Sequence, residues 1–589
     1  EARQIDYDDG ATLTHFHQVI QINSQAAAQR YTTLPLELPT PAARLTIESL
    51  QVTSGGRTAQ IATDEMQASF KIPALKIGDV LDISYRVEES RRGILARQFW
   101  TRWFFNLSGA KVQQSRFVLI TPAQMTFNFR SHGEIPAPQR SEVKTGSALW
   151  HVREWRLENL ALRQPGALSP AAQDTALWID ISSIPDWELV IAWYRDRTAS
   201  YCAPDAAIRS KALQLTKNAR TPLDKLRALH AYVARSLATQ KKEAHVNWFK
   251  LTAGQKIMRD GYGDTPGKAA LLVALCKAVG VEANLALFNT RTDGLTPFLP
   301  APRFKQAMVV AQTENGPVWL DVAQPSFDYL PAENQGVMGL LIENGITLTK
   351  TSITTPVLPA ENSISASKYQ AQLAATGELK GELEMSLSGE WADALRANFR
   401  FLPVSQRPQG IKQFSSQLMT LVRPTGGTLH NIDDFEQPLK LQLVYAGENY
   451  ATVENATLTL PLPWQNPINI PPALIDETAN QNLDAGEWEV ARLRGLSLDT
   501  LKLQLPPDFT PVELPDEIKD TSAFGRYRFT YKVEDDANTD AGEGAGKTLI
   551  VTREVLLTPL RVSSEEAPAY KAFCQSILRE SERKIVLKK

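Results

Sequence analysis

The stretch "GYGDTPGKAALLVALCKAVG", residues 261–280, contains the residue types and spacing that most suggest chemistry. It reads as a glycine-containing turn, an abrupt helix start at Thr265 and Pro266, and a long apolar helix. Helix starts of this kind hold phosphates or activated nucleophiles in several enzyme classes, because the aligned peptide dipoles leave a positive field there. The first question is whether Thr265 and its neighbours could do either.

A phosphate cradle does not fit this stretch. Counting back from Gly267-Lys268, the first glycine of a Walker loop would fall on Tyr262 and its hydroxyl residue on Ala269. A dinucleotide fingerprint that starts at Gly261 would place its third glycine on Pro266. These mismatches argue against nucleotide binding.

The cysteines offer no obvious nucleophile either. The chain has three of them, Cys202, Cys276 and Cys574, and no CxxC pair, so neither a disulfide framework nor a zinc site is indicated. Cys276 lies about 16 Å along the helix from Thr265. We predict that Cys276 and Cys574 pack in cores as small hydrophobic residues, and Cys202 is left open.

Composition narrows the class of protein. A chain of 589 residues is too long for one core, and we expect about three or four domains. The 63 basic and 65 acidic residues give a net charge of −2, which provides no reason to expect nucleic acid as a partner. The longest apolar run, 269–276, is too short to span a bilayer, so no transmembrane segment is expected.

Periodicity divides the chain into three regions. Residues 1–175 contain stretches in which apolar and polar side chains alternate, such as "DVLDISYRVEE". This alternation is typical of half-buried strands and predicts an antiparallel β-sandwich. Residues 190–350 combine helical spacing at 204–219 and 221–240, where Thr221 suits an N-cap, with a hairpin at 306–323, which predicts an α+β domain. Residues 360–589 return to strand patterns, with helices predicted at 391–402 and near the C-terminus.

Four motifs in the middle region carry a resemblance to a known family. They are "GYGDTPGKAALLVALCKAVGVEA", "RFKQAMVV", "VWLDVAQP" and "FDYLPAENQG". The chain resembles the transglutaminase-like superfamily, in the form that is fused to an N-terminal β-domain in bacterial envelope proteins. The resemblance implies a multidomain α+β protein: a β-sandwich, a papain-like transglutaminase-like core, and a β-rich C-terminal region.

The chain departs from this family at the positions that do chemistry. The family's nucleophilic cysteine maps onto Thr265, its basic histidine onto Gln306, and only its acid remains, as Asp321. A threonine hydroxyl is a weak nucleophile without an adjacent base. A glutamine amide does not titrate, and no histidine lies between His245 and His430. We therefore expect no catalysis, and expect Gln306 or a tryptophan indole to satisfy Asp321.

Thr265 and Pro266 have a structural explanation. Threonine is a preferred N-cap residue, and proline suits the first helical position because its missing N–H would have no partner there. We predict that Thr265 is the N-cap and Pro266 the first helical residue. Asp264 would add negative charge beside the positive end of the helix.

The preferred function is that of a non-catalytic binding or assembly component of a bacterial cell envelope. The alternative is an acyl-transfer or peptide-hydrolysing enzyme with an unusual residue set. The resemblance and the missing initiator methionine imply the periplasm or cell surface of a Gram-negative bacterium, with a leader removed. The expected partner is another envelope protein or a cell-surface polymer, and no cofactor or metal is expected.

An aromatic segment at 98–107 is either a domain-interface core or an interaction surface, for which Trp100, Trp103 and Phe104 are the candidates. Asn106 and Asn455 match glycosylation sequons, which short motifs often do by chance.

Two further motifs resemble metal sites. His15 and His17 lie on one face of a predicted strand, but no third ligand is evident. Asp536, Asn538 and Asp540 have calcium-loop spacing, but Ala541 and Lys547 occupy the positions of the required glycine and glutamate. We predict a solvated strand face for the first motif and a polar hairpin loop for the second.

Overall fold

The computed structural model covers residues 1–589. The described residues exclude 37–42, 62–68, 91–92, 107, 241–250, 328, 343–351, 401, 419–420, 465–469, 472–473, 475–485, 513, 515–516 and 536–545.

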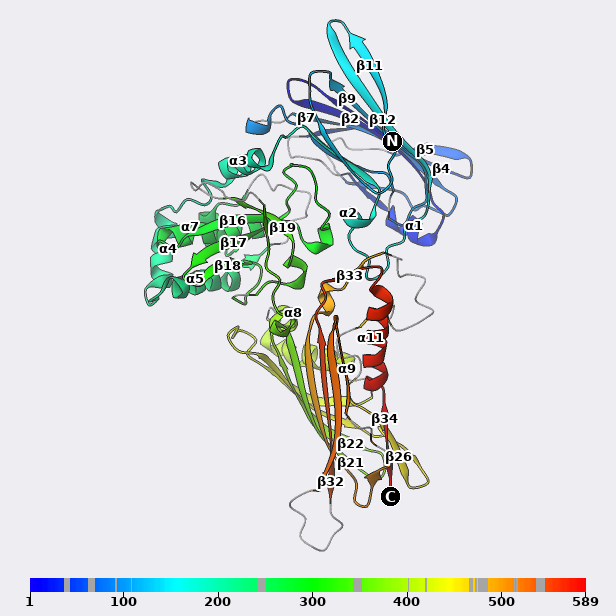
Figure 1. Ribbon diagram of the computed structural model, residues 1–589, viewed down its shortest axis with the longest axis vertical. Helices are drawn as coiled ribbons and strands as arrows, with labels where there is room; N and C mark the ends of the chain where they lie inside the picture. The colour runs from blue at the N-terminus through cyan, green and yellow to red at the C-terminus, as the bar shows by residue number, and fades with distance from the viewer. Residues whose placement is uncertain are drawn as a thin grey trace. The chain divides into compact units, whose positions relative to one another are not determined.

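The chain forms two compact units (Figure 1). The first contains Glu1–Gln164, Ala171–Ala323 and Gly336–Thr355, and the second contains Pro165–Pro170, Gln324–Gln335 and Pro356–Lys589. The first unit therefore combines the N-terminal β-region with the α+β core, and the second contains the C-terminal β-region. The predicted fold class is confirmed in outline by these elements.

An eight-stranded sheet, in the order β11-β12-β9-β1-β2-β7-β4-β5, dominates the N-terminal region. Its strands are β1 (Ala2–Asp6), β2 (Ala11–Gln21), β4 (Arg44–Ser54), β5 (Arg57–Gln60), β7 (Val80–Ser90), β9 (Val112–Pro122), β11 (Gln139–Thr145) and β12 (Ala148–Leu160). The prediction of a purely antiparallel sandwich is wrong in one detail. β1 lies between β2 and β9 and runs parallel to β9.

A second, three-stranded sheet packs on this one. Its order is β10-β13-β8, with β8 (Trp100–Phe104), β10 (Asn128–His132) and β13 (Trp178–Ser182). Ile179 and Ile181 of β13 share a buried core with Phe117 and Trp155 of the large sheet. Short elements complete the region: α1 (Gln25–Arg30), β3 (Thr33–Pro35), β6 (Ser69–Lys71) and α2 (Ala172–Thr175).

The α+β core surrounds helix α7 (Thr265–Ala278), whose residues 267–276 are all buried. α7 packs against α4, α5 and α6 and against strands β16 and β17. The other helices are α3 (Trp187–Thr198), α4 (Ala206–Thr216), α5 (Pro222–Ala231) and α6 (Gly254–Asp260). Figure 1 shows α4, α5 and α7 beside the sheet that contains β16 and β17.

That sheet has five antiparallel strands in the order β18-β17-β16-β19-β20. They are β16 (Ala283–Phe288), β17 (Gln306–Thr313), β18 (Gly316–Leu320), β19 (Met338–Ile342) and β20 (Ser352–Thr354). β17 and β18 form the predicted hairpin, with Gly316 at a φ of 104° in the turn. A short parallel pair, β14 (Ala238–Thr239) and β15 (Tyr262–Gly263), precedes α7.

The second unit is built on an eight-stranded sheet in the order β23-β24-β22-β21-β28-β32-β31-β30. Its strands are β21 (Ile364–Leu373), β22 (Leu379–Leu387), β23 (Arg423–His430), β24 (Leu439–Gly447), β28 (Gly495–Gln504), β30 (Ile518–Ser522), β31 (Gly525–Asp535) and β32 (Lys547–Leu557). Smaller sheets use β25 (Thr452–Glu454), β26 (Thr457–Pro461), β27 (Trp488–Glu489), β29 (Thr510–Pro511), β33 (Arg561–Val562) and β34 (Lys584–Lys588).

Helices α8 (Gly389–Phe399), α9 (Arg407–Leu418) and α11 (Ala567–Ser581) complete the second unit. Tyr570, Phe573 and Ile577 of α11 pack in a core that also contains Phe529 and Val555 of the sheet. The predicted helices at 391–402 and near the C-terminus are confirmed. α9 and β34 were not predicted.

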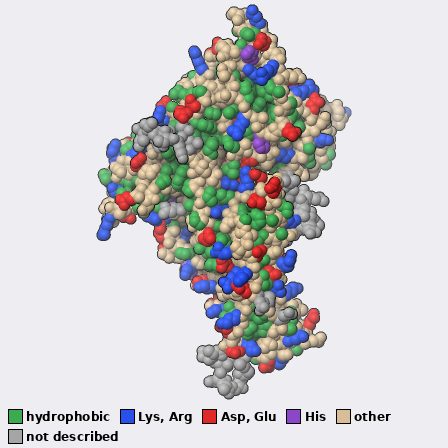
Figure 2. Space-filling view, viewed as in Figure 1, with side chains coloured by type: hydrophobic (Ala, Val, Ile, Leu, Met, Phe, Trp, Pro, Cys, Tyr) green, Lys and Arg blue, Asp and Glu red, His purple; other side chains and the backbone are tan. Residues whose placement is uncertain are grey.

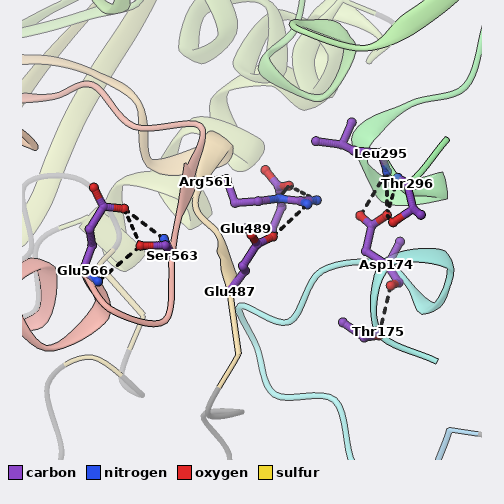
Figure 3. Close-up of polar contacts among 10 residues, drawn as sticks. Asp174, Thr175, Leu295, Thr296, Glu487, Glu489, Arg561, Ser563 and Glu566 are labelled. Atoms are coloured by element: carbon purple, nitrogen blue, oxygen red, sulfur yellow. Dashed lines mark hydrogen bonds and ion pairs between the residues drawn. The ribbon is translucent and has the colours of Figure 1, made fainter. Parts of the chain in front are cut away.

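Polar contacts fix the start of α11 and the strand pair before it (Figure 3). Ser563 and Glu566 exchange hydrogen bonds, since Glu566 Oε2 accepts from the Ser563 N–H at 3.1 Å and Ser563 Oγ accepts from the Glu566 N–H at 3.3 Å. Arg561 of β33 pairs with Glu487 at 3.1 Å and with Glu489 of β27 at 3.2 Å. The first contacts order the turn that leads from β33 into α11, and the second hold β33 to β27.

Candidate functional site

Helix α7 starts one residue earlier than predicted. Asp264, with extended backbone angles, is the N-cap, and its Oδ1 accepts a hydrogen bond from the Gly267 N–H at 2.7 Å. The prediction that Thr265 caps the helix is therefore wrong: Thr265 is the first helical residue and is half-buried. Asp264 is 8% exposed, and its Oδ2 also accepts from the Thr252 hydroxyl at 3.0 Å. The carboxylate thus satisfies two donors at the positive end of the helix.

Gly267 explains why this cap is possible. A Cβ atom at this position would lie 2.8 Å from Asp264 Oδ1 and 3.1 Å from the Thr252 carbonyl oxygen. Any larger residue would push the carboxylate away from the helix start. Gly267 therefore suits a helix start that is capped by Asp264.

Lys268 follows at once and is completely buried, with 0% exposed. Its Nζ donates to the Leu237 carbonyl oxygen at 2.9 Å and to Thr239 Oγ1 at 2.7 Å. A buried ammonium group must be compensated by such acceptors. Lys268 thereby ties α7 to β14, which pairs with the turn that leads into the helix.

Gln306 and Asp321 come to the same end of the sheet. Gln306 is the first residue of β17, and Asp321 directly follows β18, whose Leu320 pairs with Val309. Among the hydrogen bonds of the described residues, none joins the side chains of Gln306 and Asp321, and none joins Thr265 to either. The described contacts thus give no direct Gln306–Asp321 bond, and satisfaction of Asp321 by a tryptophan indole stays a prediction.

Two hydrogen-bond contacts between described residues involve Asp321. It is 5% exposed, and its Oδ1 accepts from the Ala323 N–H at 2.8 Å. Its backbone carbonyl oxygen lies 3.2 Å from Nε2 of His230, which is 1% exposed on α5. A carbonyl oxygen can only accept, so His230 carries its hydrogen on Nε2 and donates it.

His230 is the residue that sequence reasoning missed. Its position on the buried face of α5, beside Leu226 and Leu229, could have been read from helical spacing. Nothing in the spacing indicated that this face would meet the end of a strand 91 residues away.

The aromatic segment on β8 takes part in packing. Trp103 is half-buried and stacks on Phe117 with ring centres 5.6 Å apart, and its indole N–H donates to Ser115 Oγ at 3.2 Å. Trp100 and Phe104 are also half-buried, and they pair in register with residues of β13. The arrangement favours the core alternative, most clearly for Trp103.

The three cysteines are buried, as predicted for Cys276 and Cys574. Burial raises the pKa of Cys202 to about 11 and the pKa values of Cys276 and Cys574 to about 12. All three thiols are therefore protonated at neutral pH and poorly suited to nucleophilic attack.

The two motifs that resemble metal sites gain no support from the described residues. His15 and His17 face the carboxylates of Glu48 at 3.6 Å and Asp82 at 3.1 Å, so each has an acidic neighbour of its own. Within the described residues, no group of three or more His, Cys, Asp or Glu side chains is arranged to hold a metal ion. The calcium-like motif with Asp536, Asn538 and Asp540 lies outside the described residues.

The two sequons have different surroundings. Asn106 accepts a hydrogen bond from the Leu177 N–H through Oδ1 at 2.8 Å, so its side chain takes part in internal packing. Asn455 is exposed in the turn between β25 and β26.

The surface charges are mixed, as the small net charge of the chain predicts. On the face seen in Figure 2, basic and acidic side chains are interspersed. No helix in the described part of the chain has the length and apolar character needed to cross a membrane.

Comparison with known proteins supports the resemblance. Residues 41–163 match the family described as a domain of unknown function with a solved structure (DUF3857), and residues 209–333 match the transglutaminase-like superfamily. No curated protein matches the chain.

One solved structure matches over the whole length. It is a "putative protease" from Parabacteroides distasonis ATCC 8503, with a TM-score of 0.63 and 12% identity, covering 100% of this chain and 98% of that chain. At this identity the likeness shows the fold alone.

Two further solved structures overlap only weakly. They are a "putative cysteine protease" from Cytophaga hutchinsonii (TM-score 0.18, 12% identity, 38% of this chain and 71% of that chain) and the periplasmic domain of TgpA from Pseudomonas aeruginosa (TM-score 0.17, 13% identity, 52% and 92%). The chain therefore joins an N-terminal domain of the DUF3857 family to a core of the transglutaminase-like superfamily.

Proposed function

We propose that this protein is a non-catalytic transglutaminase-like protein that acts as a binding or assembly component of a bacterial cell envelope. The observation that carries the proposal is that threonine stands at the start of α7, at position 265, and glutamine at the start of β17, at position 306.

A nucleophile at a helix start is activated by the positive field of the helix dipole. Here Asp264 places a full negative charge at that point, one residue before Thr265. The carboxylate offsets the field that would favour an alkoxide or thiolate at position 265. Thr265 also has a hydroxyl whose pKa is far above neutrality, so it would need a base within hydrogen-bonding distance.

No suitable base is found among the described contacts. Gln306 stands at the position of the family's histidine, and an amide cannot accept and return a proton. His230 reaches Asp321, but its Nε2 already donates to a backbone carbonyl oxygen, and the ring is 1% exposed. These features fit a structural histidine that holds the end of β18 against α5.

In this proposal the partner binds an outer surface of the protein, such as the edge of a sheet. β11 forms one edge of the large N-terminal sheet, and every residue from Gln139 to Thr145 is exposed. An exposed edge strand can pair with an added strand from another chain. The placement in a bacterial envelope rests on the resemblance of this domain combination to envelope proteins, and the partner is another envelope protein or a cell-surface polymer.

Activity assays on the purified full-length chain test the proposal. The wild-type protein and Thr265→Ala would be compared for incorporation of a fluorescent primary amine into a glutamine-containing protein and for hydrolysis of peptides. We expect no turnover above the buffer control for either protein. Turnover by the wild type that disappears in Thr265→Ala would contradict the proposal.

The second candidate is an acyl-transfer or peptide-hydrolysing enzyme with an unusual residue set. The resemblance to the transglutaminase-like superfamily leaves it open, and the solved structure that shares the fold over the full length is itself described as a "putative protease". In that case Thr265 would need a base that is not among the described contacts. The same assay separates the two candidates.

A further inference from the structure

The loop between β16 and β17, residues 289–305, is held by residues that precede the α+β core in the sequence. These residues belong to α2 and β13, and β13 is a strand of the N-terminal three-stranded sheet. The loop leads directly into Gln306, the first residue of β17. All of these elements lie in the first compact unit.

Asp174 of α2 makes the first anchor (Figure 3). Its Oδ1 accepts from the backbone N–H groups of Leu295 at 2.8 Å and Thr296 at 2.6 Å, and from the Thr296 hydroxyl at 2.7 Å. Its neighbour Gln173 donates through Nε2 to the Thr296 carbonyl oxygen at 2.6 Å. Hydrogen bonds to a charged acceptor are among the stronger ones in proteins.

Asp180 of β13 makes the second anchor. It is 0% exposed, accepts from the Leu299 N–H at 2.9 Å, and forms an ion pair with Arg303. Arg102 of β8 pairs with the same carboxylate at 3.1 Å. Ser182, at the end of β13, donates to the Pro300 carbonyl oxygen at 2.7 Å.

Gly294 shows how closely the loop and α2 approach. Its φ is 109°, which L side chains rarely adopt, and a Cβ atom there would lie 2.5 Å from the Gln173 Cβ. The loop also has bonds of its own, such as the Lys305 N–H to Asn289 Oδ1 at 2.9 Å. Those bonds fix the two ends of the loop to each other, whereas the anchors fix its middle to α2 and β13.

We infer that the N-terminal domain, through Asp174 and Asp180, positions the loop 289–305 and, through Arg303, the start of β17 at Gln306. Asp174 and Asp180 are thus positioning residues. Arg303 lies only three residues before Gln306 in sequence, so displacement of the loop is transmitted to that strand start. A partner that binds or distorts the N-terminal domain would be coupled to this end of the core sheet. The inference holds whether or not the core retains chemistry.

Amide hydrogen exchange on the full-length protein tests this coupling. The first variant is Asp174→Asn, which keeps the side-chain volume and removes the charge, and the second is Gly294→Ala, which forces the loop away from Gln173. Asp9→Asn is the matched control, because Asp9 also accepts a backbone N–H, that of Ala11 at 2.9 Å, but in a turn remote in sequence from the loop.

We expect both variants to exchange about tenfold faster or more at residues 291–303 and at the first amides of β17. Exchange in α7 should stay at its wild-type rate, and the control should match the wild type throughout. Unchanged exchange in the loop would overturn the inference, as would acceleration of α7 together with the loop, which would indicate a general loss of stability. A loop that is released while the start of β17 keeps its protection would overturn the link to Gln306.

Discussion

His230 Nε2 lies 3.2 Å from the backbone carbonyl oxygen of Asp321, so an imidazole reaches Asp321, which we expect at the family's acid position, through the main chain. In a triad, the acid's carboxylate orients the histidine ring, and the opposite ring nitrogen takes the proton. Here the described carboxylate contact of Asp321 is to the Ala323 N–H, and the ring faces the main chain. The described His230–Asp321 contact joins the end of β18 to α5.

The cap of α7 gives the first prediction. Asp264→Ala should lower the free energy of unfolding by about 0.5–2 kcal/mol, because the Gly267 N–H and the Thr252 hydroxyl both lose their acceptor. Thr265→Ala should change it by less than about 0.5 kcal/mol, since Thr265 is not the cap. Chemical denaturation measures both.

Asp264→Asn is the control for this comparison, because asparagine caps about as well as aspartate. Equal losses for Asp264→Ala and Thr265→Ala would contradict the assignment of the cap.

The cysteines give a second prediction. Because burial raises their pKa values to about 11 or 12, the thiolate fraction at neutral pH is very small and the thiols are covered. A thiol-reactive chromogen should label none of the three in the native protein and all three in denaturant. A thiol that reacts in the native protein as fast as free cysteine would reopen the cysteine-enzyme alternative.

The pH dependence of stability gives a third prediction, through Glu390 on α8. Its carboxylate accepts from the Tyr329 hydroxyl at 3.2 Å and the Ala332 N–H at 3.3 Å, and burial raises its pKa above the ordinary value of 4.5. Between 4.5 and the raised pKa, the folded protein binds more protons than the unfolded chain. Stability from this group is therefore present below pH 4.5 and is lost as the pH rises through the folded-state pKa.

Glu390→Gln does not titrate and should flatten the stability profile across this window. Glu454→Gln, on the exposed strand β25, is the matched control and should leave the slope unchanged. Thermal or urea unfolding at a series of pH values measures both, and a wild-type slope in Glu390→Gln would contradict the prediction.

Local patterns predicted much of the fold. Thr221 and Pro222 start α5 as predicted, with a complete capping box to Asp224, because capping depends on neighbours in sequence. For α7, the sequence predicts the N-cap one residue too late, at Thr265, because aspartate and threonine are both good N-cap residues. The choice between them depends on the room that Gly267 leaves for the carboxylate and on the Thr252 hydroxyl.

The contacts around the site depend on tertiary structure. The strand alternation of β8 did not indicate that Trp103 would stack on Phe117. Likewise, no spacing rule connects Asp174 with Leu295 and Thr296, which lie more than a hundred residues further along the chain.

The last prediction concerns introduction of cysteine and histidine at positions 265 and 306, where the resemblance leads us to expect them. Thr265→Cys introduces a thiol on a half-buried position of α7, where the other thiols are buried and give little background. The helix field lowers the pKa of that thiol, but the Asp264 carboxylate opposes it, so its alkylation should follow a pKa near the ordinary ~8.5. Adding Gln306→His should shift the alkylation profile to lower pH, because an imidazolium at the start of β17 would favour the thiolate.

Thr265→Cys with Gln306→Leu is the control, since leucine removes the amide without adding a titrating group. Neither Thr265→Cys alone nor Gln306→His alone should give amine incorporation, because a nucleophile and its base act as a unit. Identical pH profiles with histidine and with leucine would show that the two positions do not meet. That outcome would support the non-catalytic proposal on geometry as well as on residue types.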